Sequence, residues 1–321
     1  MSGCIALFCG GVGGAKMAAG FAATLAASDL QIIVNVGDDF EFCGLNISPD
    51  LDTVMYTLAD RHDAEKGWGL RGETWTTMQR LIELGGPSWF QLGDQDIATH
   101  LWRTSLLRQG QSLSDVTHTL SRAHGIAHSI VPATDERLRT QIRTGDGLLD
   151  FQDYFVRLRA QPVALEILYA GAEHARPSPA LRDCLAHPSL RAIVLAPSNP
   201  WLSLGPMLAI PGVKETLGRR GLPVIAVSPI IAGKAVKGPA AKLLGELGAE
   251  ITVYGVAQFY RNVATHFVID QQDAMHADRI RALGMKVHCT DILIPSPARQ
   301  RSLAEELLDM LDRLETASFG A

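Results

Sequence analysis

The sequence predicts an α/β protein built on a doubly wound, mainly parallel sheet with a helical insertion or subdomain. An apolar run at residues 5–9 leads into a glycine-rich loop and then into a small-residue stretch with helical spacing. A second apolar run at 30–36 ends in polar residues, and similar runs recur between helical stretches in the last third of the chain. Short strands that alternate with helices are typical of a parallel, doubly wound sheet.

The individual elements follow from the same patterns. Short apolar runs predict strands at 5–9, 30–36, 126–132, 192–196, 222–227, 251–254, 267–269 and 286–288. Helical spacing predicts helices at 17–27, 54–60, 74–84, 113–124, 240–247 and 302–316, and a further one that passes through His100. A polar hairpin is expected at 141–149, and the segment 171–180 is the best candidate for a linker.

The 321 residues are expected to form a single domain. Its Rossmann-like core is predicted to comprise about residues 1–60 and 190–295, with a mostly helical region inserted at about 61–180. Because 47% of the residues are apolar, a chain of this length can bury a large core.

The composition excludes several classes of protein. The formal net charge of −5 argues against a nucleic-acid binder that relies on bulk basicity. Five cysteines without C-x-x-C pairs predict neither a zinc site nor a disulfide framework, and they fit a reducing compartment. No stretch is apolar for long enough to span a bilayer. We therefore expect a cytoplasmic protein that binds neither nucleic acid nor membrane.

The glycine-rich loop is the first candidate binding site. Gly10, Gly11, Gly13 and Gly14 follow the first strand, and Lys16 follows them. The order strand, glycine loop, helix points backbone N–H groups and a helix N-terminus at an anion. The spacing is neither the dinucleotide fingerprint, whose last glycine would fall on Lys16, nor a P-loop, because no Ser or Thr follows the lysine. The alternative is a tight turn that binds nothing.

Three pairs of aspartates stand at expected strand or loop ends: Asp38 with Asp39, Asp50 with Asp52, and Asp94 with Asp96. Carboxylate oxygens are the ligands that Mg²⁺ takes alongside substrate phosphates, so at least one pair is expected to bind a metal. In an irregular loop Asp50 and Asp52 could face one cation, whereas in a regular helix they could not. Any single aspartate is more often a cap or a turn residue.

Loops after the later strands add polar and basic side chains. Ser198 and Asn199, between two prolines, form a rigid corner that suits base or phosphate recognition and equally a helix cap. Ser228 follows the strand at 222–227. Lys234 and Lys237 stand in a glycine-bounded loop that suits diphosphate oxygens, although two solvated surface lysines are the alternative.

The loop sequences recur in an order that is typical of one family. They lie at residues 9–16, 35–39, 47–54, 92–100, 151–155, 197–200, 227–231 and 237–240. Together they resemble the 2-phospho-L-lactate transferase (CofD-like) family of coenzyme F-420 biosynthesis. The resemblance covers about residues 5–295, and Ser-Pro-Asp-Leu-Asp-Thr at 48–53 is its most specific motif.

The resemblance implies an enzyme that moves a phospho-acyl unit, either 2-phospholactate or phosphoenolpyruvate, from a guanosine diphosphate-linked donor to the deazaflavin Fo. GMP leaves, Mg²⁺ is required, and a homodimer is expected. Asp52 is implied to lie near the deazaflavin and the metal with Asp50 beside it, and either carboxylate could take the proton of the attacking hydroxyl. The family's usual basic residues are replaced here by Gln91, at a position that contacts the deazaflavin, and by Gln95.

Two other functions remain open. A nucleotide-sugar-binding regulator of the same fold would share the glycine loop but lack the motif at 48–53, which is intact here. A nicotinamide-dependent oxidoreductase could use Asp38 for ribose, but its glycine spacing is different. No Ser-His-Asp or Cys-His pattern predicts covalent catalysis, and His100 is interpreted as an ordinary helix residue.

Overall fold

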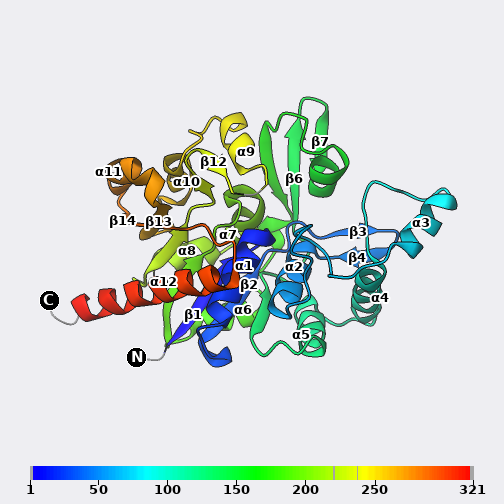
Figure 1. Cartoon of the computed structure of the whole chain (residues 1–321), viewed down its shortest axis with the longest axis horizontal. Coiled ribbons are helices and arrows are strands. Elements are labelled where there is room, and N and C mark those ends of the chain that lie inside the picture. The colour runs from blue at the N-terminus through cyan, green and yellow to red at the C-terminus, as the bar shows by residue number, and fades with distance from the viewer. Residues whose placement is uncertain (1–2, 220, 237, 319–321) are drawn as a thin grey trace.

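A seven-stranded sheet forms the centre of the molecule (Figure 1). In the computed structural model, which describes residues 3–219, 221–236 and 238–318, the strand order is β14-β13-β10-β9-β1-β2-β5. The strands are β1 (Cys4–Cys9), β2 (Leu30–Val34), β5 (Ser129–Pro132), β9 (Leu190–Leu195), β10 (Val224–Val227), β13 (His266–Asp270) and β14 (Lys286–Thr290). Every neighbouring pair is parallel, which confirms the predicted doubly wound α/β fold.

The sheet is buried on both faces. The side chains at 5–9 of β1 and at 192–195 of β9 are fully buried, because helices cover both sides of these central strands. Helix α1 (Gly11–Ala22) packs against both α2 (Pro49–Leu58) and the long C-terminal helix α12 (Pro297–Ser318) (Figure 1). Gly20 allows this close approach, since a Cβ there would collide with the carbonyl oxygen of Gln300.

The region 61–180 departs from the mostly helical segment that we expected. Its first part holds α3 (Thr76–Glu83), α4 (Asp94–Arg108) and α5 (Leu113–Ala123), which extend to one side of the sheet in Figure 1. The chain then forms the edge strand β5 of the central sheet and a separate antiparallel sheet of β6 (Arg139–Thr144), β7 (Gly147–Asp150) and β8 (Glu166–Ala170). The helical description is therefore wrong beyond Ala123, where alternating side chains replace the helical period.

The remaining elements are short. They are a hairpin of β3 (Phe40–Phe42) and β4 (Leu45–Ile47), a hairpin of β11 (Ile230–Ile231) and β12 (Lys234–Ala235), and the helices α6 (Pro179–Ala186), α7 (Gly205–Ala209), α8 (Val213–Arg219), α9 (Ala240–Glu246), α10 (Val253–Tyr260) and α11 (Ala277–Arg281). Short segments of 3₁₀ or π helix lie at Ala27–Asp29, Asp153–Arg157, Ala172–His174, Pro200–Leu204 and Gln271–His276. None of the helices in the described part of the chain has the length and hydrophobicity of a membrane span.

Two predicted helix starts are wrong in ways that affect the site, and one predicted strand is absent. Helix α1 begins at Gly11, inside the glycine loop, and not at 17. Helix α2 begins at Pro49 and not at 54, because proline suits the first position of a helix. Residues 251–254 do not form a strand, since α10 begins at Val253.

Candidate active site

The loops after β1 and β9 meet at one edge of the sheet. From β1 the chain continues to β2 on one side, and it returns later to β9 on the other side, so the crevice between β1 and β9 is a topological switch point. The two loops are joined by hydrogen bonds. The Gly10 N–H donates to Ser198 Oγ (3.2 Å), whose hydroxyl donates to the Gly10 carbonyl oxygen (2.8 Å). This is the edge where ligands bind in open α/β sheets.

A cleft of about 680 Å³ opens from this crevice. It brings together most of the residues that the sequence singled out. Those that line it are Gly10, Gly11, Gly13, Lys16, Asp38, Asp50, Asp52, Gln91, Asp96, Ser198, Asn199 and Ser228. Gly14, Asp39, Asp94 and Lys234 are not among the residues that line it, and Lys237 lies outside the described residues.

The glycines of the first loop are needed for packing as well as for access. A Cβ at Gly10 would collide with Asp50 Oδ2 and lie 2.8 Å from Ser203 Cβ, and one at Gly14 would lie 2.6 Å from Ser198 Oγ. Gly11 has a φ of +62°, which side-chain-bearing residues rarely adopt. Gly14 is therefore a packing residue that lets α1 approach the end of β1 and the loop after β9, whereas Gly10 and Gly11 also face the cleft.

Gly10→Ala is expected to weaken ligand binding and to destabilise the fold by about 1–3 kcal/mol, because the new methyl group displaces Asp50 or Ser203. Chemical denaturation and a nucleotide-binding assay measure the two effects. The matched control is Gly145→Ala, where a Cβ meets no atom within 4 Å and the stability should stay within about 0.5 kcal/mol of the wild type. Equal behaviour of the two variants would contradict the close packing of this loop.

Asp50 connects α2 to the glycine loop. It lies in the first turn of α2, and its carboxylate accepts hydrogen bonds from the Gly11 N–H (2.7 Å) and from Asn35 Nδ2 (3.0 Å). Burial raises the pKa of Asp50 to about 6, although both hydrogen bonds oppose the shift. Asp50 therefore changes its charge close to neutral pH.

Asp38 is the second buried acid of this end of the cleft. It follows β2, and its Oδ1 is buried with no hydrogen-bond partner among the described residues. Burial and the nearby charge of Asp50 both raise the pKa of Asp38 well above its ordinary value. The two carboxylates thus repel each other, and the charge of Arg139 opposes the upward shift of the pKa of Asp38 only in part.

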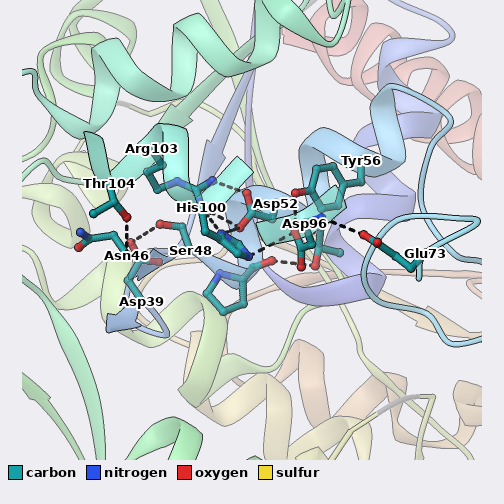
Figure 2. A network of polar contacts seen from close by, with 12 residues as sticks. Asp39, Asn46, Ser48, Asp52, Tyr56, Glu73, Asp96, His100, Arg103 and Thr104 are labelled. Carbon is teal, nitrogen blue, oxygen red and sulfur yellow. Dashed lines mark hydrogen bonds and ion pairs between the residues drawn. The ribbon is translucent and has the colours of Figure 1, made fainter. Parts of the chain in front are cut away.

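Asp52 points to a different group of residues, shown in Figure 2. Its two oxygens accept hydrogen bonds from the guanidinium of Arg103, one from Nη1 (3.0 Å) and a shorter one from Nη2. Both side chains are buried, and Asp52 keeps the pKa of Arg103 above its ordinary value despite that burial. Because α2 is already helical at Pro49, Asp50 and Asp52 diverge, and their carboxylates contact different groups.

His100 links this ion pair to Asp96. Nη1 of Arg103 lies 3.0 Å from His100 Nδ1, and since a guanidinium can only donate, Nδ1 is the acceptor. The ring proton is therefore on Nε2, which faces Asp96 Oδ1 at 3.3 Å. The same oxygen accepts a hydrogen bond from the Tyr56 hydroxyl (2.6 Å).

The charges of this network are fixed by these contacts. Burial alone would raise the pKa of Asp96, but the contacts from the His100 ring and from the Tyr56 hydroxyl outweigh it and lower that pKa. Asp52, Asp96 and His100 each bring one possible ligand atom within 4.8 Å of the others. However, the Arg103 guanidinium already contacts Asp52 and His100 and balances the negative charge there, so this group does not need a metal ion.

The sequence reasoning missed the parts that His100 and Arg103 play. Asp96, His100 and Arg103 recur at intervals of four and three residues, which places them on one face of α4. A helix face that carries an acid, a histidine and an arginine is unusual for a buried surface. That spacing was the signal that could have identified them.

Asp94 serves as a helix cap and not as a cleft residue. Its carboxylate accepts hydrogen bonds from Thr74 Oγ1 (2.5 Å) and from the backbone N–H groups of Thr76 (3.1 Å) and Thr77 (2.9 Å). These bonds, that of Thr74 first, hold the pKa of Asp94 below its ordinary value. The predicted binding role of Asp94 is therefore corrected to capping of α3.

A reciprocal contact fixes the start of α4. The Glu73 carboxylate accepts hydrogen bonds from the backbone N–H groups of Gln95 (2.8 Å) and Asp96 (2.9 Å). The Gln95 side chain donates to the Gly72 carbonyl oxygen (3.1 Å). Gln95 is thus a structural residue outside the cleft, whereas Gln91 lines it.

Asp39 and Lys234 lie away from the cleft. Asp39 accepts a hydrogen bond from Ser48 Oγ (2.9 Å) and borders a separate hollow of about 150 Å³. Burial raises the pKa of Asp39 to about 7, and Arg139 only partly opposes this. Lys234 is exposed in the β11–β12 hairpin, so the alternative of a solvated surface lysine describes its position.

The geometry defines a doubly wound α/β protein whose glycine loop and buried acids share one cleft at the sheet edge. The family model described as 2-phospho-L-lactate transferase CofD matches residues 5–293, so the chain belongs to this family. It is a transferase of coenzyme F-420 biosynthesis with a Rossmann-like fold, as its motifs implied.

Known proteins support this assignment along the whole chain. A phosphoenolpyruvate transferase of Streptomyces griseus is 35% identical, with 97% of this chain and 99% of the relative covered. A 2-phospho-L-lactate transferase of Methanosarcina mazei is 36% identical, with 93% and 97% covered. A solved structure of a UPF0052 family member from Bacillus halodurans shares the fold, with a TM-score of 0.62, 12% identity, and 96% and 99% of the two chains covered.

Proposed function

We propose that the enzyme transfers a phospho-acyl unit, 2-phospholactate or phosphoenolpyruvate, from a guanosine diphosphate-linked donor to the deazaflavin Fo and releases GMP. The relatives named above carry one or other of these acyl groups in their names. The observation that carries the proposal is a single cleft in which the N-terminus of α1 and Lys16 face the carboxylates of Asp38, Asp50 and Asp52. Such a cleft can bind a diphosphate and activate a hydroxyl beside it.

The donor's diphosphate fits the glycine-loop end of the cleft. Gly10 and Gly11 use their N–H groups to hold Ser198 and Asp50. The next N–H groups, of Val12 and Gly13, belong to cleft-lining residues in the first turn of α1, where no carbonyl within the helix can accept them. These groups, the helix dipole and the Lys16 ammonium would bind phosphate oxygens.

Mg²⁺ fits the pair Asp38 and Asp50 better than Asp50 with Asp52. The buried Oδ1 of Asp38 has no hydrogen-bond partner among the residues described, and burial together with the nearby charge of Asp50 raises the pKa of Asp38. Hard oxygen ligands of this type suit Mg²⁺ next to substrate phosphates. When bound, the ion would neutralise negative charge on the diphosphate.

The remaining steps are proton transfer to Asp52 and alignment of the hydroxyl with the donor's phosphorus. A hydroxyl oxygen of Fo forms a bond to the donor's β-phosphorus, the bond from that phosphorus to the bridging oxygen breaks, and GMP departs with the bond electrons. Asp52 accepts the hydroxyl proton, because its carboxylate oxygens keep lone pairs beyond those that bind Arg103. Arg103 fixes the orientation of this carboxylate, so catalysis relies on alignment of the reacting groups.

The proposal is tested by incubation of the enzyme with a guanylyl-linked donor and Mg²⁺, with and without Fo. Chromatography should detect GMP only when Fo is present, and EDTA should abolish its release. Release of GMP at the same rate without Fo would identify a hydrolase, and no release with any donor would contradict transferase chemistry of this kind.

The affinity for Mg²⁺ is expected to rise from pH 5 to pH 8. The cation binds ionised carboxylates, and Asp50 loses its proton near pH 6 while Asp38 does so well above its ordinary range. Protonation therefore competes with the cation in the lower part of this window. Isothermal titration calorimetry of the free enzyme measures this, and an affinity that does not change with pH would exclude these two ligands.

A further inference from the structure

Two of the five free cysteines belong to neighbouring elements at the edge of the sheet opposite to the cleft. Cys4 is the first residue of β1 and is partly exposed. Cys184 lies in the last turn of α6, on the face of that helix that is buried, and it is 6% exposed. The glycine loop follows the other end of β1, after Cys9, so this pair of cysteines is separate from the candidate active site.

Two tight turns bring the end of α6 to the start of β1. The His187 N–H donates to the Cys184 carbonyl oxygen (3.1 Å), and the Leu190 N–H donates to the His187 carbonyl oxygen (3.2 Å). Leu190 is the residue of β9 that pairs with Cys4, and the Cys4 N–H donates to the Ser189 carbonyl oxygen (2.9 Å). Because the ends of such a turn lie within about 7 Å of each other, α6 ends close to the first residue of β1.

The side chains of Cys4 and Cys184 are hydrogen-bonded to each other. This hydrogen bond lowers the pKa of the Cys4 thiol from its ordinary value, and it outweighs burial, which acts in the opposite direction. Cys9, at the other end of the same strand, is fully buried, and burial raises its pKa far above the ordinary value. An accessible thiol of lowered pKa beside a second cysteine is the usual arrangement of a redox-sensitive pair.

We propose that Cys4 and Cys184 are converted to a reversible disulfide when the enzyme meets a peroxide. The Cys4 thiolate forms a bond to one peroxide oxygen, the O–O bond breaks, and the departing hydroxide takes up a proton and leaves as water. The Cys184 sulfur then forms a bond to the Cys4 sulfur, the S–O bond of the Cys4 sulfenic acid breaks, and a second water leaves. Two thiols thereby lose two electrons and two protons, one peroxide is reduced to two waters, and a dithiol reverses the change.

The disulfide ties α6 to a central strand of the sheet. The segment that it encloses, from residue 4 to residue 184, is more than half of the chain, and a cross-link over so long a segment restricts the unfolded chain strongly. The bond forms at the start of β1, away from the glycine loop, so it stabilises the fold and leaves the cleft unchanged. This inference does not depend on the proposed transfer reaction.

Peptide mass spectrometry of the complete protein, treated with hydrogen peroxide and alkylated without reduction, tests this inference. The wild type should give a cross-linked pair of peptides that contain Cys4 and Cys184, and dithiothreitol should remove the cross-link. In Cys184→Ser, Cys4 should remain as a sulfenic acid that dimedone traps. The control is Cys43→Ser, which removes an exposed cysteine in the β3–β4 turn and should form the cross-link as the wild type does.

Thermal melting provides a second readout that needs no variant. The oxidised wild type should melt about 3–6 °C above the wild type kept in dithiothreitol. Cys184→Ser should melt at the same temperature after both treatments. If peroxide oxidises the exposed Cys43 and Cys289 while Cys4 and Cys184 stay unlinked, the inference is wrong. A cross-link that forms but lowers the melting temperature would overturn the stabilising role that we assign to it.

Discussion

Replacement of Arg103 by methionine is expected to lower the free energy of unfolding by about 3–5 kcal/mol. Arg103 is 1% exposed and binds both oxygens of Asp52, which is also buried. Methionine fills most of the space but leaves a carboxylate that is buried without its counter-charge, and it removes the donor that fixes the tautomer of His100. Denaturant unfolding measures the stability, and steady-state kinetics should show a lower kcat with a smaller change in KM.

A double-mutant cycle separates the contribution of the ion pair to stability from the contribution of side-chain packing. Asp52→Asn should also destabilise the fold, because it leaves Arg103 as the unpaired charge, whereas Asp52→Asn combined with Arg103→Met should recover part of the loss. The control is Arg143→Met, which breaks an exposed ion pair with Glu166 and should cost about 1 kcal/mol or less. A loss for Arg103→Met as small as that of the control would show that the buried pair is not structural.

Asp38→Asn and Asp50→Asn are each expected to weaken Mg²⁺ binding by at least about tenfold, and to reduce turnover by about two orders of magnitude. Each variant removes one of the two carboxylates that we assign to the cation, while the shape of the side chain is retained. Calorimetric titration of the free enzyme gives the affinity without reference to activity. The control is Asp183→Asn on the exposed side of α6, which should bind Mg²⁺ as the wild type does.

The ionisation of Asp38 that favours Mg²⁺ binding lowers the stability of the metal-free fold. A carboxyl group whose folded-state pKa is raised favours the folded state at low pH, and this stabilisation is lost as the pH rises from the ordinary value of 3.8 toward the folded value. In EDTA, the melting temperature of Asp38→Asn minus that of the wild type should therefore increase from pH 5 to pH 8. A difference in melting temperature that is constant over this range would show that the folded state does not raise the pKa of Asp38.

The sequence was sufficient to predict the parallel sheet and the polar loops that follow its strands. The strands are short, apolar and buried on both faces, so they stand out against the helical pattern around them. Polar residues directly after β1, β2 and β9 had to meet at one edge once the sheet was parallel. Gly10, Asp38 and Ser198, which the sequence singled out, all line this cleft.

The different contacts of Asp50 and Asp52 could not be predicted from the sequence in the same way. It depends on the start of α2 at Pro49, which turns Asp50 toward Gly11 and Asp52 toward Arg103. Arg103 is 51 residues further along the chain, and local patterns carry no information on such a contact. Asp94 was a candidate binding residue in the sequence, but in the structure its carboxylate accepts hydrogen bonds from the N-terminus of α3 and caps that helix.

The most direct test of the account is mass spectrometry of the products that form when the enzyme is incubated with Fo, Mg²⁺ and each of the two guanylyl-linked donors. The account predicts that at least one donor gives Fo with its ribityl hydroxyl esterified by the phospho-acyl unit, together with one GMP per product molecule. It also predicts that this product is lost in EDTA and strongly reduced with Asp52→Asn. Unmodified Fo after incubation with both donors, from enzyme that binds Fo and Mg²⁺, would contradict it.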